Sequence, residues 1–331
     1  MSLWTIQRAA LMAVAALLVS CGGGNTGTPA AEGTKQATKA DPADPAMTVQ
    51  LRVLSSPPQW VSGGDARVEV RAAPGLHDKL ELWLNGRKLD VALVSKPGRL
   101  EGLISGLALG DNRLEVRHKS SGVRDTLILT NHPITGPMFS GAQQMPFVCT
   151  TTQGGIAQQP LIDSPTPSGH AVLDVGGNRI GYSRNCSIRV SVSYQYRSAA
   201  NSWKALPGDG SRPADMSTVT LADGRTVDFV IRREVGSINR FLYSFAMLAP
   251  RGESPSSPDL SLWNGKLLYW FQGGVAIGHS QGTVHSGSLN PDVLARGYAI
   301  AHSSGNNTGT HYNMNLAGET AMMTKERFVE R

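Results

Sequence analysis

A serine lies at the centre of a Gly-x-Ser-x-Gly pattern near the C-terminal end of this 331-residue sequence. The pattern runs from Gly278 to Gly282, with Ser280 in the middle. In a nucleophile elbow, this spacing places the serine on a sharp turn between a strand and a helix, where its Oγ is exposed and an adjacent base can take its proton. The pattern therefore indicates acyl-transfer chemistry with Ser280 as the nucleophile, provided that the neighbouring residues form such a turn.

The residues around Ser280 do not match that setting. Only three residues separate Gly274 from the start of the pattern, which is short for a central strand. Residues 283–288, Thr-Val-His-Ser-Gly-Ser, form a poor helix start because they contain a β-branched pair and a glycine. We therefore keep Ser280 only as an alternative nucleophile, with His302 or His311 as its base, and expect the pentapeptide to be coincidental.

A glycine pair directly follows a hydrophobic segment upstream of the serine. Residues 267–271 have the length and aromatic content of a buried strand, and Gln272, Gly273 and Gly274 come next. Glycines at such a position let the backbone turn its N–H groups toward a developing negative charge. One such donor typically contributes about 3–4 kcal/mol to stabilising a tetrahedral oxyanion. We expect Gly273 and Gly274 to form an oxyanion loop; a tight packing turn is the alternative.

Four histidines in the C-terminal part of the sequence do not form a recognisable metal-binding motif. They are His279, His285, His302 and His311, and no cysteine or carboxylate lies at ligand spacing from them. We expect loop or pocket histidines instead. The sequence predicts no metal and no cofactor.

The N-terminal segment has the pattern of an export signal. Arg8 precedes an apolar stretch, residues 9–19, which is too short to cross a membrane as a helix. Residues 18–21, Leu-Val-Ser-Cys, resemble the lipobox of bacterial lipoproteins, in which the cysteine is lipidated. Because no acidic residue directly follows Cys21, we expect a protein that is lipid-anchored at the bacterial outer membrane or in the periplasm. A signal peptide with an incidental cysteine is the alternative.

Composition and charge limit the other function classes. Hydrophobic residues make up 40% of the chain and charged residues 17%, with 37 glycines and 19 prolines, which favours a β-rich exported protein. The formal net charge is +6, but the basic residues are dispersed, so we expect no nucleic-acid partner. Cys149 and Cys186 are an even pair and are expected to form a disulfide in an oxidising compartment; two buried thiols are the alternative.

Period-2 alternation of apolar residues predicts a β-sandwich in residues 47–131. Residues 49–53 alternate in this way, and similar segments follow at sandwich-like spacing, separated by turn signals such as Asn85-Gly86. Residues 109–116 resemble the late hairpin of bacterial immunoglobulin-like modules. No catalytic motif lies in this region, so a supporting role is expected for it.

Strand and helix signals alternate toward the C-terminus. Residues 267–271 read as a strand, residues 290–292 cap a helix with proline at its first position, and residues 298–301 read as the next strand. Apolar residues then recur at helical spacing over residues 314–328. Because strand, helix, strand, helix is the signature of parallel βαβ units, we expect residues 132–331 to form a partial α/β domain.

The sequence thus predicts four regions. They are a lipoprotein signal peptide (1–21), a disordered tether (22–46), an immunoglobulin-like β-sandwich (47–131) and the N-terminal part of an α/β-hydrolase-like domain (132–331).

Several motifs after the tether resemble those of known families. They lie at residues 134–137, 144–149, 263–268, 273–278, 296–301, 311–313 and 318–321. They resemble an uncharacterised bacterial α/β-hydrolase-like family, domain of unknown function 6351, and more distantly the tannase and feruloyl esterase family. The resemblance implies an α/β-hydrolase-like core and Ser-dependent ester hydrolysis in complete members.

The same resemblance implies where the catalytic residues should be. In the relatives the catalytic serine is expected on a separate elbow after the next strand, followed by the acid and the histidine, so this chain looks truncated before its nucleophile. We therefore expect an exported lipoprotein with little or no hydrolase activity, whose partners are the membrane and a small ester or polymer substrate. The alternatives are a surface-polymer-binding or structural lipoprotein, and an active small serine esterase that uses Ser280.

Overall fold

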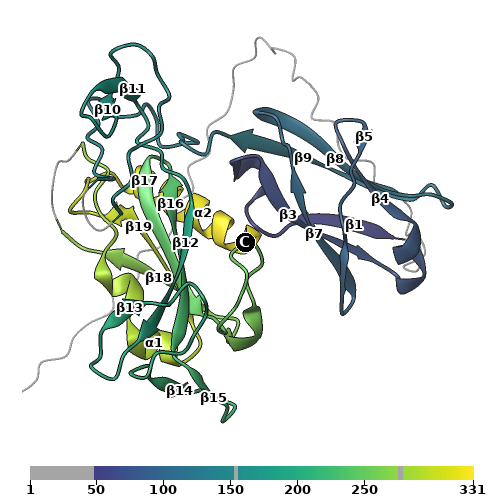
Figure 1. The fold of residues 1–331 in the computed structure, drawn as a ribbon. Helices are drawn as coiled ribbons and strands as arrows, with labels where there is room; N and C mark the ends of the chain where they lie inside the picture. Colours follow the sequence, from purple (N-terminus) through teal and green to yellow (C-terminus); the bar gives the residue numbers. More distant parts are fainter. Residues whose placement is uncertain (1–47, 153–155, 275–278) are drawn as a thin grey trace, which may run out of the picture. The chain divides into compact units, whose positions relative to one another are not determined.

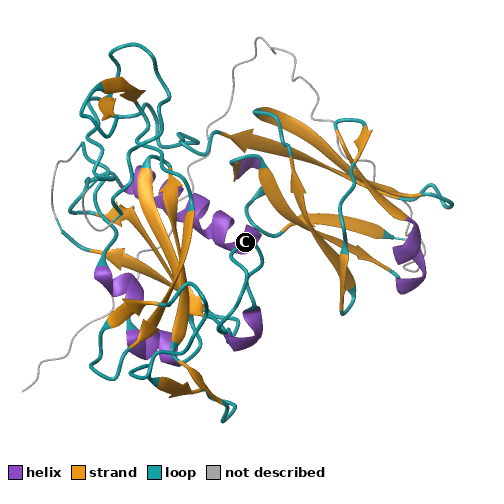
Figure 2. Cartoon of the chain, viewed as in Figure 1, coloured by secondary structure: helices purple, strands orange, loops and turns teal. Residues whose placement is uncertain are grey.

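The computed structural model describes residues 48–152, 156–274 and 279–331. The predicted signal peptide and tether, with Cys21, lie outside these residues. Strands predominate in the described part of the chain, where α1 (Pro291–Ala295) and α2 (Met314–Glu330) are the α-helices (Figures 1 and 2). No helix in that part is long and apolar enough to cross a membrane.

Residues 49–132 form two sheets that share one core. The strand orders are β1-β3-β7-β6 and β2-β9-β8-β4-β5. Their bounds are β1 Val49–Val53, β2 Val61–Ser62, β3 Asp65–Ala72, β4 Leu80–Leu84, β5 Arg87–Lys88, β6 Val94–Lys96, β7 Arg99–Ser105, β8 Gly110–His118 and β9 Arg124–His132. Every second residue of β7 is buried, because alternate side chains of a strand point to opposite faces. The buried residues form one hydrophobic cluster with members from both sheets, consistent with an immunoglobulin-like module.

A six-stranded sheet organises the rest of the described chain. Its order is β13-β12-β16-β17-β19-β18. The bounds are β12 Ser191–Arg197, β13 Trp203–Ala205, β16 Val230–Ile238, β17 Phe241–Leu248, β18 Leu267–Gln272 and β19 Ala299–Asn307. Every residue of β17 is buried because both faces of this central strand are covered. One face packs in a core cluster with Leu294 of α1, and the other packs in a cluster with Met323 of α2.

Short elements complete the structure around these sheets. Two small hairpins pair β10 (His170–Leu173) with β11 (Arg179–Ser183) and β14 (Thr218–Thr220) with β15 (Thr226–Asp228). Short 3-10 turns are η2 Pro58–Trp60, η3 Pro74–Lys79, η4 Leu260–Leu262 and η5 Ser286–Leu289.

The sheet order contradicts the partial α/β-hydrolase-like domain predicted from the sequence. The strand pairs β12–β16, β16–β17 and β17–β19 are antiparallel, and of the named pairs in this sheet only β18–β19 is parallel. The predicted strand-helix-strand unit exists as β18, α1 and β19, but β19 pairs on its other side with a hairpin strand. Because only Asn239 and Arg240 connect β16 to β17, these two strands must run antiparallel. The described chain is therefore a β-rich fold.

Helix boundaries agree with the sequence signals. Asn290 caps α1, and its side-chain oxygen accepts hydrogen bonds from the backbone N–H groups of Asp292 and Val293. Asn313 caps α2 in the same way by accepting from Leu316 N–H. Such caps satisfy N–H groups that have no partner inside the helix. The helices predicted from Pro291 and from Met314 are confirmed.

Candidate functional site

Ser280 lines a small cavity, of about 30 Å³, together with His311. Its segment forms an isolated parallel bridge with Val148, because Val148 N–H donates to the His279 carbonyl and Gln281 N–H donates to the Val148 carbonyl. The next α-helix begins only at Pro291. Ser280 therefore lies in an extended segment and not on a turn between a strand and a helix.

The imidazole of His311 offers Ser280 no free nitrogen. Its Nε2 lies 2.7 Å from the Gly305 carbonyl oxygen, which can only accept, so Nε2 carries the proton. Its Nδ1 then accepts from the Asn313 backbone N–H at 3.2 Å. Burial lowers the pKa of His311, although the Gly305 carbonyl opposes this effect. A general base needs a lone pair directed at the proton that it removes, and here that lone pair is engaged.

His302 lies on β19 and is fully buried. Its Nδ1 is 3.3 Å from the Trp270 carbonyl, and burial lowers its pKa more than the carbonyls of Trp270 and Thr283 raise it. His302 is not among the residues that line the cavity with Ser280. Of the two bases considered from the sequence, the structure brings only His311 to the same cavity. Within the described ranges, no group of three or more His, Cys, Asp or Glu side chains is placed to hold a metal ion.

Gly273 and Gly274 are exposed and follow β18 directly. Gly274 has a φ of +145°, and a Cβ at this position would lie 3.0 Å from backbone atoms of Gly309. Thr308 fixes the same segment, because its Oγ1 donates to the Gly274 carbonyl at 2.5 Å and its N–H donates to the Gln272 carbonyl at 3.1 Å. This close approach of two backbones explains the need for glycine at position 274. The oxyanion role of the glycine pair stays a prediction.

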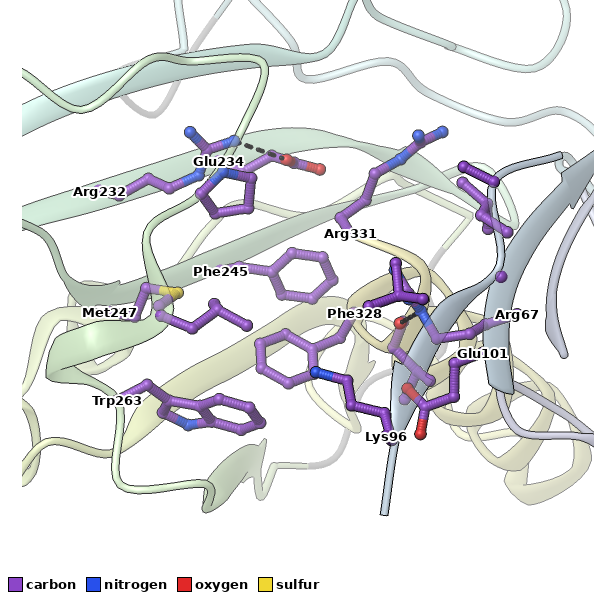
Figure 3. Close-up of a pocket in the computed structure, with 17 residues that line it drawn as sticks. Arg67, Lys96, Glu101, Arg232, Glu234, Phe245, Met247, Trp263, Phe328 and Arg331 are labelled. Carbon is purple, nitrogen blue, oxygen red and sulfur yellow. Dashed lines mark hydrogen bonds and ion pairs between the residues drawn. The ribbon is translucent and has the colours of Figure 1, made fainter. Parts of the chain in front are cut away.

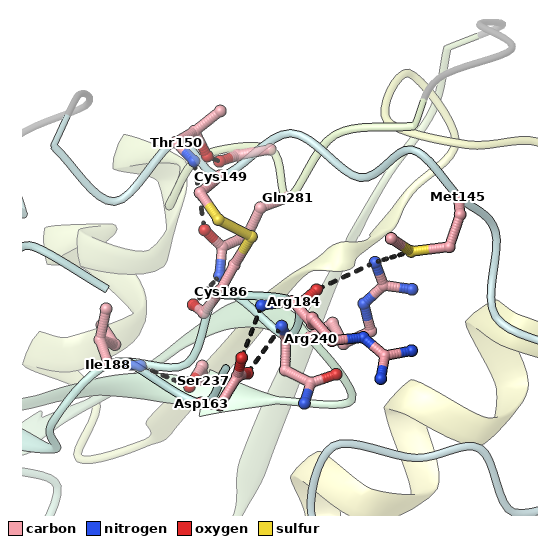
Figure 4. The surroundings of a disulfide bond; sticks show 12 residues. Met145, Cys149, Thr150, Asp163, Arg184, Cys186, Ile188, Ser237, Arg240 and Gln281 are labelled. Atoms are coloured by element: carbon pink, nitrogen blue, oxygen red, sulfur yellow. Dashed lines mark hydrogen bonds between the residues drawn. A yellow bond between two sulfur atoms is a disulfide. The ribbon is translucent and has the colours of Figure 1, made fainter. Parts of the chain in front are cut away.

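Cys149 and Cys186 form a disulfide bond, as the sequence predicted (Figure 4). Gln281 lies beside it, with Nε2 donating to the Cys186 carbonyl at 2.7 Å and Oε1 accepting from Thr150 N–H at 3.2 Å. The chain-entropy model assigns about 4 kcal/mol to closing a loop of this length. The disulfide and Gln281 together hold the segment that contains Ser280.

A buried carboxylate, Glu319 of α2, holds a second segment of the same cavity wall. Its Oε2 accepts hydrogen bonds from the backbone N–H groups of Met138, Phe139 and Ser140 at 2.9, 2.6 and 2.7 Å. Its Oε1 accepts from Ser140 Oγ and from Asn239 Nδ2, both at 2.9 Å. Both oxygens of this fully buried side chain therefore accept structural hydrogen bonds, and Glu319 is not available to act on a ligand.

A larger cavity, of about 420 Å³, has an aromatic wall (Figure 3). Phe245 comes from β17, Trp263 follows η4, and Phe328 comes from α2. The Phe328 ring lies between the other two, with centroid distances of 5.4 Å to Phe245 and 5.8 Å to Trp263, both in edge-on geometry. Met247 and Leu260 add further apolar surface.

Charged side chains surround this aromatic cavity. Four cationic residues and two acidic residues line it, namely Arg67, Lys96, Arg232, Arg331, Glu101 and Glu234. Glu234 is neutralised by Arg327 at 3.2 Å and by Arg232 at 3.7 Å. Arg67 of β3 donates to the Val329 carbonyl at 2.7 Å and so joins the first two sheets to the end of α2. Arg232 and Arg331 also pair with Glu253 and Asp65, at 3.3 and 3.0 Å, so acidic partners outside the lining balance these two charges.

The comparison with protein families identifies the relationship of this chain. The model of the "Tannase-like family of unknown function (DUF6351)" matches residues 51–331. The chain belongs to this family. This tannase-like protein has no match among curated proteins.

The tannase-like chain also has matches among solved structures. A chain described as "Chimeric titin Z1Z2 functionalized with a KLER exogenous peptide from decorin" is 10% identical, with a TM-score of 0.20. The similarity covers 58% of the tannase-like chain and 91% of the titin chimera. A TM-score this low supports no inference about fold or function.

Proposed function

We propose that this tannase-like protein binds an aromatic ester in the 420 Å³ cavity. The observation that supports the proposal is the aromatic wall of Phe245, Trp263 and Phe328, which β17, the segment after η4 and α2 bring together. The volume falls within the range of about 300–1,000 Å³ that is usual for small-molecule sites. An offset or edge-on aromatic pair contributes about 0.5–1.5 kcal/mol beyond the burial of its area.

Lys96 in the cavity lining supports an ester or phenolic ligand. Its ammonium group can donate hydrogen bonds to a carbonyl or phenolate oxygen. The family description, tannase-like, points to the same ligand class. An aromatic ring against Trp263 with an oxygen at the rim would use both parts of the cavity.

Replacement of Trp263 by alanine is expected to weaken the binding of methyl ferulate about 10-fold, because an aromatic contact worth about 1.4 kcal/mol is lost. Isothermal titration calorimetry measures this change. Trp83→Ala is the matched control, because Trp83 of β4 does not line the cavity. Equal affinities for the parent protein and Trp263→Ala would contradict the proposal.

Hydrolysis through Ser280 is the second candidate, because Ser280 and His311 line one cavity. The engaged nitrogens of His311 argue against it. Hydrolysis of p-nitrophenyl acetate by the same samples is expected to be equal for the parent protein and Ser280→Ala. Strong turnover that Ser280→Ala abolishes would establish this second candidate instead.

We also propose that the protein is exported and anchored through a lipid at Cys21. The lipobox-like residues 18–21 support the anchor, and the Cys149–Cys186 disulfide suits an oxidising compartment. In a bacterial host, Cys21→Ala is expected to shift the protein from the membrane fraction to the soluble fraction. Unchanged fractionation of this variant would exclude the lipid anchor.

A further inference from the structure

Arg240 carries a buried positive charge without an acidic partner. The residue is 4% exposed, and Nη1 donates to the Gln144 carbonyl at 3.1 Å. Nη2 lies 3.4 Å from the Arg184 carbonyl and 3.5 Å from Met145 Sδ (Figure 4). Phe147 packs below, with its ring centroid 3.7 Å from Cζ. In the part of the chain that the structure describes, no carboxylate forms an ion pair with Arg240, and its Nε has no hydrogen-bond partner.

The unpaired guanidinium is costly for the folded protein. Removing a charge from water is unfavourable unless an opposite charge or several hydrogen bonds compensate. Burial, together with the positive charge of Arg184, lowers the pKa of Arg240 to about 10, against the opposing effect of Asp163. At neutral pH the side chain is therefore still charged. An anion that paired with it would offset part of the desolvation cost.

The backbone at Arg240 is also strained. Asn239 and Arg240 form the two-residue turn between β16 and β17, with φ values of +52° and +71°. A turn of this kind normally takes glycine at its second position, because a Cβ disfavours the left-handed region. The turn therefore holds Arg240 in a backbone region that is sparsely populated by residues other than glycine.

Arg240 and Ser280 line the same small cavity, and the N-terminus of α2 opens onto it. Asn313 and Leu316, the N-cap and first turn of this 17-residue helix, are part of the lining. The N-terminal end of a helix favours negative charge. Further polar side chains in the lining are Ser140, Gln143, Gln144, Asn239 and Ser280.

The cavity is small. Its volume is about 30 Å³, above the minimum of about 10–15 Å³ that a cavity needs to hold one water molecule. A compact anionic group such as a carboxylate therefore suits it.

We propose that this cavity binds a carboxylate group, which pairs with the guanidinium of Arg240 and accepts hydrogen bonds from polar side chains of the lining. Arg240 supplies the charge, and the side-chain amide of Asn313 is a further donor in the lining. His311 adds no competing charge, because its proton is held by the Gly305 carbonyl. The carboxylate belongs either to a small free acid or to the end of a larger ligand that extends through the cavity mouth.

Thermal unfolding in the presence of sodium formate tests the proposal. Sodium methanesulfonate keeps the ionic strength constant without supplying a carboxylate group. When the formate concentration is about ten times its Kd, we expect the Tm of the parent protein to rise by about 2–4 °C. This is the shift expected for a chain of this size. Arg240→Met is expected to lose this rise. Arg233→Met is the matched control, because Arg233 also has an unpartnered Nε but lies outside the cavity, and it should keep the rise.

The remaining outcomes are also decisive. A rise with benzoate as well as formate identifies the end of a larger ligand, and a rise with formate alone identifies a small free acid. No saturable rise, or an equal rise in Arg240→Met, overturns the proposal. If Arg240→Met does not fold, NMR spectra of the parent protein test the proposal instead. The Arg240 Nε–H resonance is assigned by its absence from the spectrum of Arg240→Lys. That resonance must shift saturably with formate, and an unchanged resonance overturns the proposal.

Discussion

Replacement of Glu319 by alanine is expected to lower the free energy of unfolding by about 4 kcal/mol. The carboxylate accepts five hydrogen bonds, three of them from consecutive backbone N–H groups of residues 138–140. Hydrogen bonds to a charged group contribute about 1.5–3 kcal/mol each, and donors left buried without a partner cost a further penalty. Urea denaturation, with the m-value compared between variants, measures the loss.

Glu319→Gln separates the loss of charge from the loss of acceptors. One amide oxygen can still accept from residues 138–140, but the amide NH₂ then faces Asn239 Nδ2, which is also a donor. A smaller loss of about 2 kcal/mol is therefore expected for this variant. A change below about 1 kcal/mol in Glu319→Ala would show that this carboxylate does not hold the loop.

The unfolding free energy is expected to fall by on the order of 5 kcal/mol between pH 5 and pH 9 because of two buried carboxyl groups of α2. Burial raises the pKa of Glu326 to about 7, although the hydroxyls of Ser56 and Ser62 oppose this effect. Burial, followed by the charges of Glu326 and Asp65, raises the pKa of Glu330 to about 8. Both begin from 4.5 in the unfolded chain.

The direction of this pH dependence follows from whether the folded or the unfolded state binds the two protons more tightly. Because the folded state holds these protons more tightly, their stabilising contribution is complete below about pH 4.5 and is lost as the pH rises through about 7 and 8. The charges of Lys325, Arg327 and the Arg331–Asp65 ion pair surround the pair and do not reverse its direction. The interface that α2 forms with β2 and β3 should therefore weaken in alkaline solution.

Glu330→Gln provides the direct check of this pH dependence. The variant is expected to match the parent protein near pH 5 and to be more stable near pH 9, because it cannot acquire the buried charge. Asp174→Asn is the matched control, because the pKa of that exposed carboxyl is lowered by hydrogen bonds from Asn178 and it titrates below this range. Parallel stability profiles for Glu330→Gln and the parent would contradict the assignment.

Local structure could be predicted from the sequence, whereas the sheet order could not. The cap at Asn290, the helix over residues 314–328 and the strand at residues 267–271 depend on neighbouring residues, and the structure contains all three elements. Residues 226–232 and 240–248 read as strands in the sequence, but their pairing as the β16–β17 hairpin was not predicted, because the Asn-Arg turn lacks the usual glycine. Arg232 can be buried because ion pairs with Glu253 and Glu234 compensate its positive charge.

The candidate site was even less accessible to sequence analysis. Phe245, Trp263 and Phe328 belong to separate elements, so no spacing in the chain connects them, and only tertiary packing forms the aromatic wall. The Gly-x-Ser-x-Gly pattern around Ser280, by contrast, is visible in the sequence, but the neighbouring residues do not form the required turn between a strand and a helix. The structure gives the physical reason, because Ser280 lies in an extended bridge and both nitrogens of His311 are bonded to the backbone.

A crystal structure of the protein soaked with methyl ferulate tests the central claim most directly. The ferulate ring is expected in the 420 Å³ cavity, against Trp263 and Phe328, with an oxygen toward the rim that includes Lys96. An empty aromatic cavity, with the ester bound at Ser280 instead, would contradict the account.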